Sequence, residues 1–239
     1  MKILVSLLIF LFAPQMIWAN NQLWQYSKSD STKIVALLDE AKNEKEDTNF
    51  PLYFANKFIG IRYVASTLER NKTEKLVINL QELDCTTLVE NVLALTLCAK
   101  TKQYTFKQFC TFLQKIRYNN GIISYPTRLH YFSEWINDNT KQGFVKEINT
   151  PNPPFKSQQI LDLHYMSTQH HKYPMLVQNP SWIKEIRRME QMVSGKTVNY
   201  IPKGILNNSS LIKDFIKDGD IIAIVTARKG LDTSHIGFA

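Results

Sequence analysis

Residues 83–98, LDCTTLVENVLALTLC, constrain the fold more than any other stretch of this chain. Apolar side chains recur at helical spacing from Cys85 onward, which predicts a buried helix. Asp84 stands at the N-cap position, where its carboxylate can accept hydrogen bonds from the N–H groups of the first turn. The inward positions of this helix are expected to be Leu88, Val89, Val92, Leu93 and Thr96.

Cys85 in this first turn has two interpretations. Free cysteine is among the most buried residue types, so inert packing is the plain one. The alternative is a nucleophile, because unpaired N–H groups and the helix dipole favour the thiolate at a helix start. A cysteine hydrolase also needs a base, usually a histidine within hydrogen-bond reach. The histidines therefore decide between the two.

The five histidines differ in their surroundings. His170 and His171 form a doublet without cysteine or carboxylate neighbours at ligand spacing, so we expect a solvated surface and no metal site. His164 is expected to be structural. His130 lies in the cluster RLHYFSEW, which is typical either of a pocket wall or of packing at a helix start. His235 begins a predicted strand among small residues, so its side chain can project toward a helix N-terminus and favours the nucleophile interpretation modestly.

The order of the remaining elements predicts the fold class. Further helices are expected over residues 33–43, 50–59, 105–118, 131–139 and 180–195. We expect Ser31 or Thr32 to cap the first of them. The tail changes period, because IIAIVTA and SHIGFA read as two strands joined by a short connection. Helices followed by paired strands predict an α+β fold.

The N-terminus, MKILVSLLIFLFAPQMIWAN, predicts a secretory signal peptide over residues 1–19, cleaved after Ala19. A retained anchor is the weaker alternative, because the unbroken apolar run is short compared with the roughly 20 residues that span a bilayer. Residues 20–239 are then expected to form a single domain without a lasting membrane anchor.

Charge and cysteine count limit the partners. The formal net charge of +8 is compatible with nucleic acid, an anionic surface or an acidic substrate. There is no Lys/Arg block and no basic run interleaved with aromatics, so nucleic-acid binding is disfavoured and a solubilising surface is the simplest explanation. Three cysteines are an odd number, so at least one thiol is free or paired between chains. Cys98 and Cys110 form either a disulfide or two buried thiols.

Ordered motifs give the chain a family resemblance. The motifs are GIRY at Gly60–Tyr63, the DCT helix start, GDIIAI at 219–224 and SHIG at 234–237, and they resemble those of NlpC-type, papain-like cysteine peptidases of bacterial cell walls. The longer stretches LVINLQELDCTTLVENVLAL and YPTRLHYFSEWINDN are similar to the N-acetylmuramoyl-L-alanine amidase-like branch over roughly 58–239. The resemblance implies a nucleophile helix packed on an antiparallel sheet, with an added helical lobe at about 100–200. It also implies a periplasmic location.

The resemblance implies roles for particular residues. Cys85 would be the nucleophile and His235 the general base, with Tyr63 helping the Cys85 N–H to stabilise the oxyanion. The family often has proline where this chain has Arg62. Arg128 would pair with a substrate carboxylate. His130, Tyr131 and Trp135 would line the substrate site, although a structural lobe explains such aromatic residues equally well.

The implied activity is hydrolysis of the amide between N-acetylmuramic acid and L-alanine in peptidoglycan fragments, through a thioester and without a cofactor. A stem-peptide endopeptidase that cleaves after D-glutamate is the alternative within the same class. A third residue that orients His235 is implied to lie on further strands, whereas the sequence ends at Ala239. Against this resemblance the C-terminus is expected to be truncated, and a catalytically inactive peptidoglycan-binding protein remains an alternative.

Overall fold

The computed structural model describes residues 23–148, 155, 157–206 and 209–239. The expected signal peptide lies outside the described residues, so the structure does not test it. Among the described residues, no helix is both long and apolar enough to cross a bilayer.

Helices and strands both occur, so the fold is α+β as predicted. The helices are α1 (Lys28–Ala41), α2 (Phe50–Asn56), α3 (Cys85–Lys100), α4 (Phe106–Arg117), α5 (Phe132–Lys141), α6 (Tyr165–Thr168), α7 (Pro174–Gln178), α8 (Trp182–Val193) and α9 (Ser209–Phe215). The strands are β1 (Trp24–Gln25), β2 (Arg62–Tyr63), β3 (Leu76–Val77), β4 (Glu82–Leu83), β5 (Ser157–Ile160), β6 (Thr197–Tyr200), β7 (Ile221–Val225) and β8 (Thr233–Phe238). Short 3₁₀ turns cover Thr67–Arg70, Asn119–Gly121, Tyr125–Thr127, His170–Lys172 and Lys203–Ile205.

The described strands pair only two by two. β1 pairs with β3 and β2 with β4 in parallel, whereas β5–β6 and β7–β8 are antiparallel. The final hairpin was predicted from the change of period in the tail. α3 packs against β8, as the resemblance implied, but the sheet there is a two-stranded hairpin. A larger antiparallel sheet is not present among the described strands.

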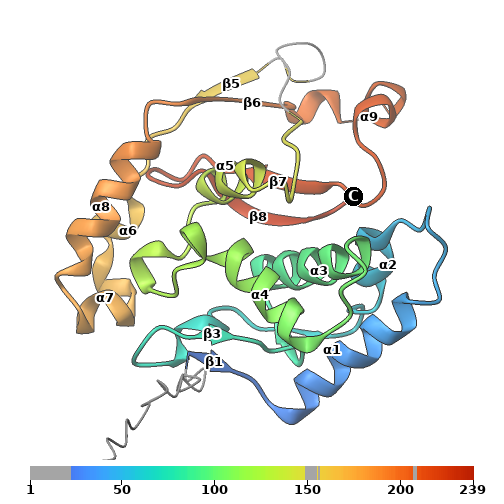
Figure 1. Ribbon diagram of the computed structural model, residues 1–239. Coiled ribbons are helices and arrows are strands. Elements are labelled where there is room, and N and C mark those ends of the chain that lie inside the picture. The colour runs from blue at the N-terminus through green and yellow to red at the C-terminus, as the bar shows by residue number, and fades with distance from the viewer. Residues whose placement is uncertain (1–22, 149–154, 156, 207–208) are drawn as a thin grey trace, which may run out of the picture.

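Helix α3 is the central element of the main core (Figure 1). It begins at Cys85, and Asp84 forms a capping box with Thr87, as the N-cap position predicted. Val89 and Val92 are fully buried, and the helix packs against α1, α2 and α4. Leu88 was expected to face inward and is only half-buried, because it packs at the margin of this core.

The first helix starts earlier than predicted. It begins at Lys28 rather than at residue 33, and its cap is Ser27 instead of Ser31 or Thr32. The Asp30 N–H donates to the Ser27 hydroxyl and the Asp30 carboxylate accepts from the Ser27 N–H, which completes a capping box. The same carboxylate also accepts from the distant Leu80 N–H at 2.9 Å. The carboxylate of Asp30 therefore joins a helix start to the segment before β4.

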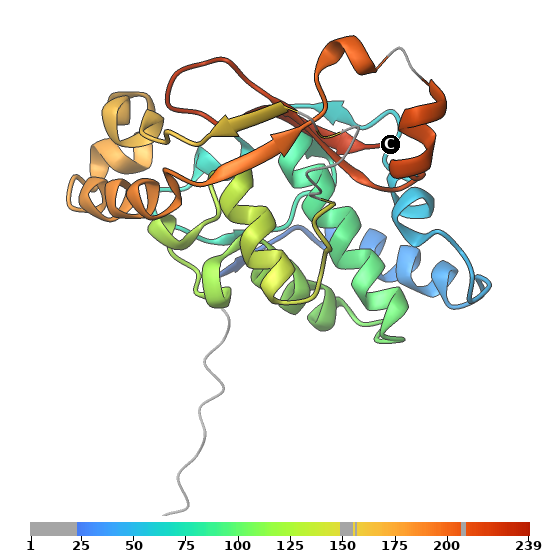
Figure 2. The same cartoon turned by 90° about the horizontal axis from the view of Figure 1, so that it is seen from above.

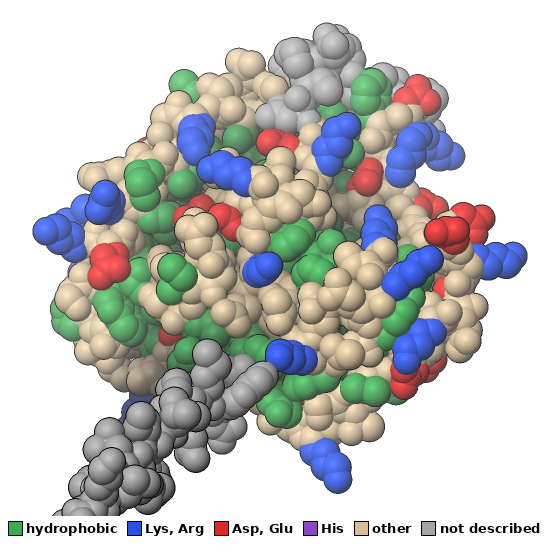
Figure 3. Space-filling model, viewed as in Figure 1, with side chains coloured by type: hydrophobic (Ala, Val, Ile, Leu, Met, Phe, Trp, Pro, Cys, Tyr) green, Lys and Arg blue, Asp and Glu red, His purple; other side chains and the backbone are tan. Residues whose placement is uncertain are grey.

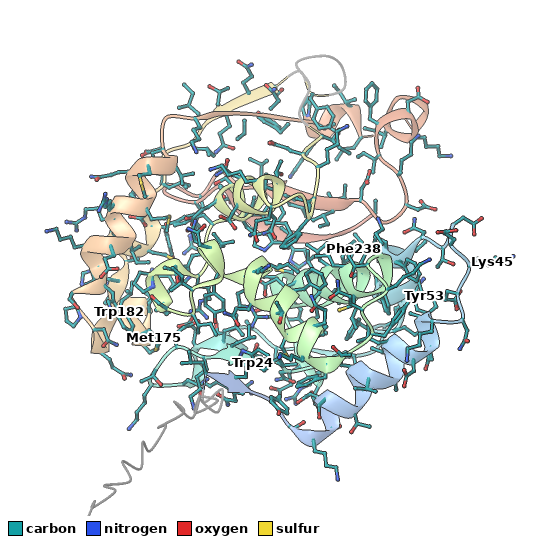
Figure 4. All side chains as sticks on the ribbon, viewed as in Figure 1. Trp24, Lys45, Tyr53, Met175, Trp182 and Phe238 are labelled. Carbon is teal, nitrogen blue, oxygen red and sulfur yellow. The ribbon has the colours of Figure 1, made fainter. Side chains whose placement is uncertain are left out.

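A second hydrophobic cluster forms a lobe at one end of the molecule, where α6, α7 and α8 gather in Figures 1 and 2. Met175 and Trp182, labelled in Figure 4, belong to this lobe. An antiparallel ribbon of β5 and β6 extends away from this lobe in Figure 1. Tyr131 joins the lobe to α5, since its hydroxyl donates to Glu190 of α8 at 2.7 Å.

The surface agrees with the solubility explanation of the net charge. On the face shown in Figure 3, Lys and Arg side chains are dispersed and interspersed with Asp and Glu rather than gathered into one patch. A dispersed distribution gives no continuous groove for a polyanion on this face.

Candidate active site

The Cys85 thiol lies at the start of α3 in a half-buried position. Asp84 Oδ1 accepts hydrogen bonds from the Thr87 N–H and from the Thr87 hydroxyl, each at 2.8 Å. The Asp84 carboxylate is thereby held against the first turn of α3. The remaining N–H groups of the first turn provide the positive end of the helix dipole beside the thiol.

His235 enters from the other end of the chain. It lies on β8 opposite Ile224 of β7, and the register shift that follows leaves Ser234 as a β-bulge residue. Ile236 turns into the core, whereas the His235 side chain is exposed to solvent. Bulges are common beside active sites because they redirect a side chain.

One cleft contains both residues. It has a volume of about 160 Å³ and is lined by Cys85, by residues within 129–135 and by 231–236, which include His235. Cys85 and His235 are far apart in sequence, so only the packing of β8 on α3 brings them to a common cleft. Among the described residues, no hydrogen bond of the His235 imidazole is present, nor one between it and Cys85.

Tyr63 is placed next to Cys85 by strand pairing. It stands opposite Leu83 in the parallel β2–β4 pair, and Leu83 comes two residues before Cys85 in the sequence. Burial raises the pKa of Tyr63 above its ordinary value, and the neighbouring Cys85 and Asp84 side chains raise it further. The phenol therefore stays protonated near neutral pH and can donate a hydrogen bond toward the thiol side of the cleft.

Arg62, the residue that departs from the resembled motif, forms ion-pair contacts next to Tyr63. Its guanidinium pairs with Glu82 on the neighbouring strand, and Arg70 pairs with the same carboxylate at 2.6 Å. Hydrogen bonds from Arg70 and Arg62 lower the pKa of Glu82. The departure from the family pattern is thus accommodated by a cross-strand ion pair beside Tyr63.

A larger cavity of about 430 Å³ adjoins the cleft, with Thr86, Leu129 and His130 lining both. Arg128 also lines it and is 5% exposed. The Arg128 guanidinium pairs with Glu69, and its Nε lies 3.6 Å from Glu74 Oε1. Two protein carboxylates therefore already hold the residue that was predicted to meet a substrate carboxylate.

His130 has one nitrogen committed to the fold. Its Nε2 lies 2.8 Å from the Tyr125 carbonyl oxygen, an acceptor, so Nε2 carries the proton. Burial lowers the pKa of His130 to about 3, and the Arg128 charge lowers it in the same direction. The imidazole is neutral near pH 7, and its Nδ1 can only accept a hydrogen bond.

Tyr131 and Trp135 contribute to the wall of the cleft but are almost completely buried, with 2% and 1% exposure. Trp135 stacks on Phe132 with ring centroids 5.1 Å apart. The two aromatic side chains are therefore packed in the core and also border the cleft.

The other cysteines and histidines have no place in this cleft. Cys98 and Cys110 are free buried thiols, so of the two alternatives the structure has no disulfide, and burial raises the pKa of each to about 12. His170 and His171 are exposed, as predicted. The part of the chain that the structure describes contains no group of side chains suited to a metal ion.

Asp232 was not identified by the sequence patterns. It is 5% exposed, lines the cleft, and its Oδ2 accepts a hydrogen bond from the Ser133 N–H at 2.7 Å. No local motif signals this contact, because its two partners are far apart in the chain.

Comparison with protein families identifies the family of this chain. The model of the AmiA-like family, described as N-acetylmuramoyl-L-alanine amidase-like, matches residues 53–239. The chain belongs to this family. The match begins before Tyr63 and includes both Cys85 and His235, so the amidase-like family covers every residue of the candidate site.

Solved structures support the family assignment. An N-acetylmuramoyl-L-alanine amidase from Bacteroides uniformis is 40% identical, with a TM-score of 0.70 over 79% of this amidase-like chain and 78% of that chain. A Bacteroides fragilis protein whose name suggests a xylanase is 41% identical, with a TM-score of 0.70 over 78% and 80%. A Legionella pneumophila protein of the DUF1460 family is 22% identical with a TM-score of 0.66 over 88% and 79%, which shows a shared fold alone. No protein of curated function matches the chain.

Proposed function

We propose that this protein is an exported cysteine amidase that hydrolyses the amide between N-acetylmuramic acid and L-alanine in peptidoglycan fragments. The observation that carries the proposal is the common cleft of Cys85 and His235 in a chain of the amidase-like family. A papain-like arrangement, with a nucleophile helix against the strand that bears the base, is part of the proposal. So are the signal peptide and a periplasmic location, which fit a substrate in the cell wall.

The proposed reaction uses two steps. The Cys85 thiolate attacks the carbonyl carbon of the muramoyl lactyl group, and the oxyanion that forms accepts hydrogen bonds from the Cys85 N–H and the Tyr63 hydroxyl. Protonated His235 donates its proton to the alanine nitrogen as the C–N bond breaks, which releases the stem peptide and leaves a thioester. Water, deprotonated by His235, then attacks the thioester to release the sugar acid and regenerate the thiol.

Paired carboxylates that could support glycoside hydrolysis instead are not available at this cleft. That reaction needs two carboxyl groups flanking the bond. Among the described residues lining the cleft, Asp232 is the one carboxylate, and both of its oxygens accept backbone N–H groups. In the adjoining cavity, Glu69 and Glu90 are paired with arginines, and Asp84 is engaged in capping α3. These contacts favour thiol chemistry over the activity that the Bacteroides fragilis name suggests.

The adjoining cavity is proposed to receive the rest of the substrate. His130 borders both spaces, and its Nδ1 is proposed to accept a substrate N–H or O–H. Arg128 is proposed to meet a substrate carboxylate from between Glu69 and Glu74, and Tyr131 and Trp135 to form the apolar wall against sugar or peptide.

Product identity tests the proposal. Wild-type protein is incubated with a defined muropeptide, and the products are identified by mass spectrometry. We expect free stem peptide beginning with L-alanine and a sugar that has lost the whole peptide. A sugar that retains L-alanyl-D-glutamate would instead show the endopeptidase. Saturable muropeptide binding without turnover would show a binding protein and overturn the enzyme proposal.

Replacement of His235 tests the proposed pair without a substrate. His235→Ala is expected to slow alkylation of Cys85 by iodoacetamide about tenfold at neutral pH, because the imidazole no longer helps to form the thiolate. Peptide mapping assigns the alkylated thiol. A matched control is His171→Ala, which removes an exposed imidazole that does not line the cleft. Equal rates for all three proteins would contradict the pairing.

The hydroxyl of Tyr63 gives a further prediction. Tyr63→Phe keeps the ring and removes the donor, so we expect kcat to fall about tenfold with a smaller change in KM. The expected loss is modest because the side chain is 61% exposed, where water can replace part of the hydrogen bond. Steady-state kinetics on the muropeptide measure it, and an unchanged kcat would remove Tyr63 from the oxyanion site.

A further inference from the structure

The hairpin that carries His235 needs support from outside itself. β7 and β8 form a two-stranded ribbon, which is at best marginally stable on its own. Ile224 and Val225 of β7 are exposed, so the face of the ribbon near His235 contributes little to the core. The position of His235 therefore depends on where the connection before β8 is attached.

The first attachment of this connection is Gly230. Its carbonyl oxygen accepts hydrogen bonds from the N–H groups of His164 and Tyr165, at 3.2 and 3.1 Å. Gly230 has a φ of +81°, and a Cβ there would lie 2.9 Å from the Tyr165 nitrogen. Glycine permits both the positive φ and this close approach. Leu231 then packs against the second hydrophobic cluster.

The second attachment is Asp232, the buried carboxylate three residues before His235. Helix α5 begins after Tyr131, which supplies no side-chain cap. Asp232 Oδ2 accepts from the Ser133 N–H in the first turn of α5 at 2.7 Å, and Oδ1 accepts from the Thr233 N–H at 2.7 Å. A carboxylate at a helix N-terminus is favoured both by the unpaired N–H groups and by the dipole.

The Asp232 carboxylate thus connects α5 and β8, the two elements that contribute residues to the cleft wall. α5 provides Phe132 and Trp135 to its wall, and β8 provides His235. Ile236 on the far side of the histidine is fixed in the main core. From these contacts we infer that Asp232 is a positioning residue for the proposed reaction, holding the start of β8 on α5 so that His235 faces the Cys85 side of the cleft. The inference rests on the proposed function. Asp232, which precedes His235 in the sequence, would then be the residue that supports the histidine.

Asp232→Ala removes both hydrogen bonds of the second attachment and leaves the Gly230 contacts in place. We expect kcat on the muropeptide to fall about tenfold while KM changes less than about twofold, because the proton carrier is displaced but the adjoining cavity is intact. Alkylation of Cys85 should fall to the rate of the His235→Ala variant. Asp232→Asn keeps one acceptor and should give an intermediate loss, and it replaces the alanine variant if that one does not fold.

Asp30→Ala is the matched control. Asp30 is also a buried carboxylate, 4% exposed, and it also accepts backbone N–H groups at a helix start and from a distant segment. Both alanine variants should lower the melting temperature by a similar few degrees, about 2–4 °C. Only the Asp232 variant should lose kcat and Cys85 alkylation when both are assayed well below their melting temperatures.

The outcomes separate the two levels of the proposal. If Asp232→Ala melts lower but keeps wild-type kcat and alkylation, its role is structural and the inference is wrong. If the wild type shows no turnover at all, the proposed function fails, while the alkylation comparison still tests Asp232. Equal slowing of alkylation in the Asp30 and Asp232 variants would also overturn the inference, because it would show a general effect of lost stability.

Discussion

Cys85→Ala is expected to abolish release of the stem peptide, with kcat/KM falling by at least about a thousandfold. The Cys85 sulfur is the atom that forms the proposed thioester. Among the described residues lining the cleft, no other cysteine is present to replace it. The measurement is chromatographic quantification of stem peptide from a defined muropeptide at equal protein concentration. Binding of the same muropeptide should remain, because the adjoining cavity is unchanged.

Cys98→Ala is the matched control for this substitution. Cys98 lies on the same helix and is fully buried, so its removal is expected to lower stability through a small cavity and leave turnover intact. Melting curves of both variants establish that they are folded. Turnover by Cys85→Ala at a rate near that of the wild type would refute the nucleophile assignment and, with it, the cysteine mechanism.

Arg117→Met is expected to lower the free energy of unfolding by about 3–5 kcal/mol. Arg117 and Glu90 form a buried ion pair, 1% and 2% exposed, with Nε and Oε2 2.7 Å apart. The same guanidinium donates to the Val77 carbonyl at 2.7 Å. Removing the arginine leaves a buried carboxylate on α3, one and a half turns after Cys85, without its partner. Urea unfolding at pH 7, followed by circular dichroism, measures the loss.

Two further measurements identify the cause of that loss. Arg117→Met combined with Glu90→Leu should recover most of the stability, because an apolar pair replaces the buried charges. Burial raises the pKa of Glu90, and Arg117 opposes that rise. Without the arginine the folded state favours the neutral carboxyl of Glu90. The loss in free energy of unfolding of Arg117→Met, relative to the wild type, should therefore shrink as the pH is lowered from 7 and grow as the pH rises. A double variant as unstable as the single one would contradict this explanation.

Much of the fold was predictable because the relevant signals are local. The helix that begins at Cys85, its Asp84 cap and the β7–β8 hairpin each follow from residues within a few positions of one another. The start of α1 was misplaced because Ser27 and Asp30 form a capping box that lies before the apolar pattern. The bulge at Ser234 and the two-by-two strand pairing have no comparable local signal, because they depend on how distant segments pack.

The features of the candidate site likewise separate into those with a local sequence signal and those that depend on packing. Cys85 at a helix start, His235 on a strand and the order of the family motifs can all be inferred from short-range patterns in the sequence. The folded structure was needed to show that both line one cleft, that Arg128 is held between Glu69 and Glu74, and that Trp135 is buried. It alone showed that Asp232 reaches the start of α5, because a hydrogen bond across 99 positions arises from the packing of two elements and leaves no period in either. LDCTTLVEN thus specifies the position of the thiol, and the surrounding fold decides what faces it.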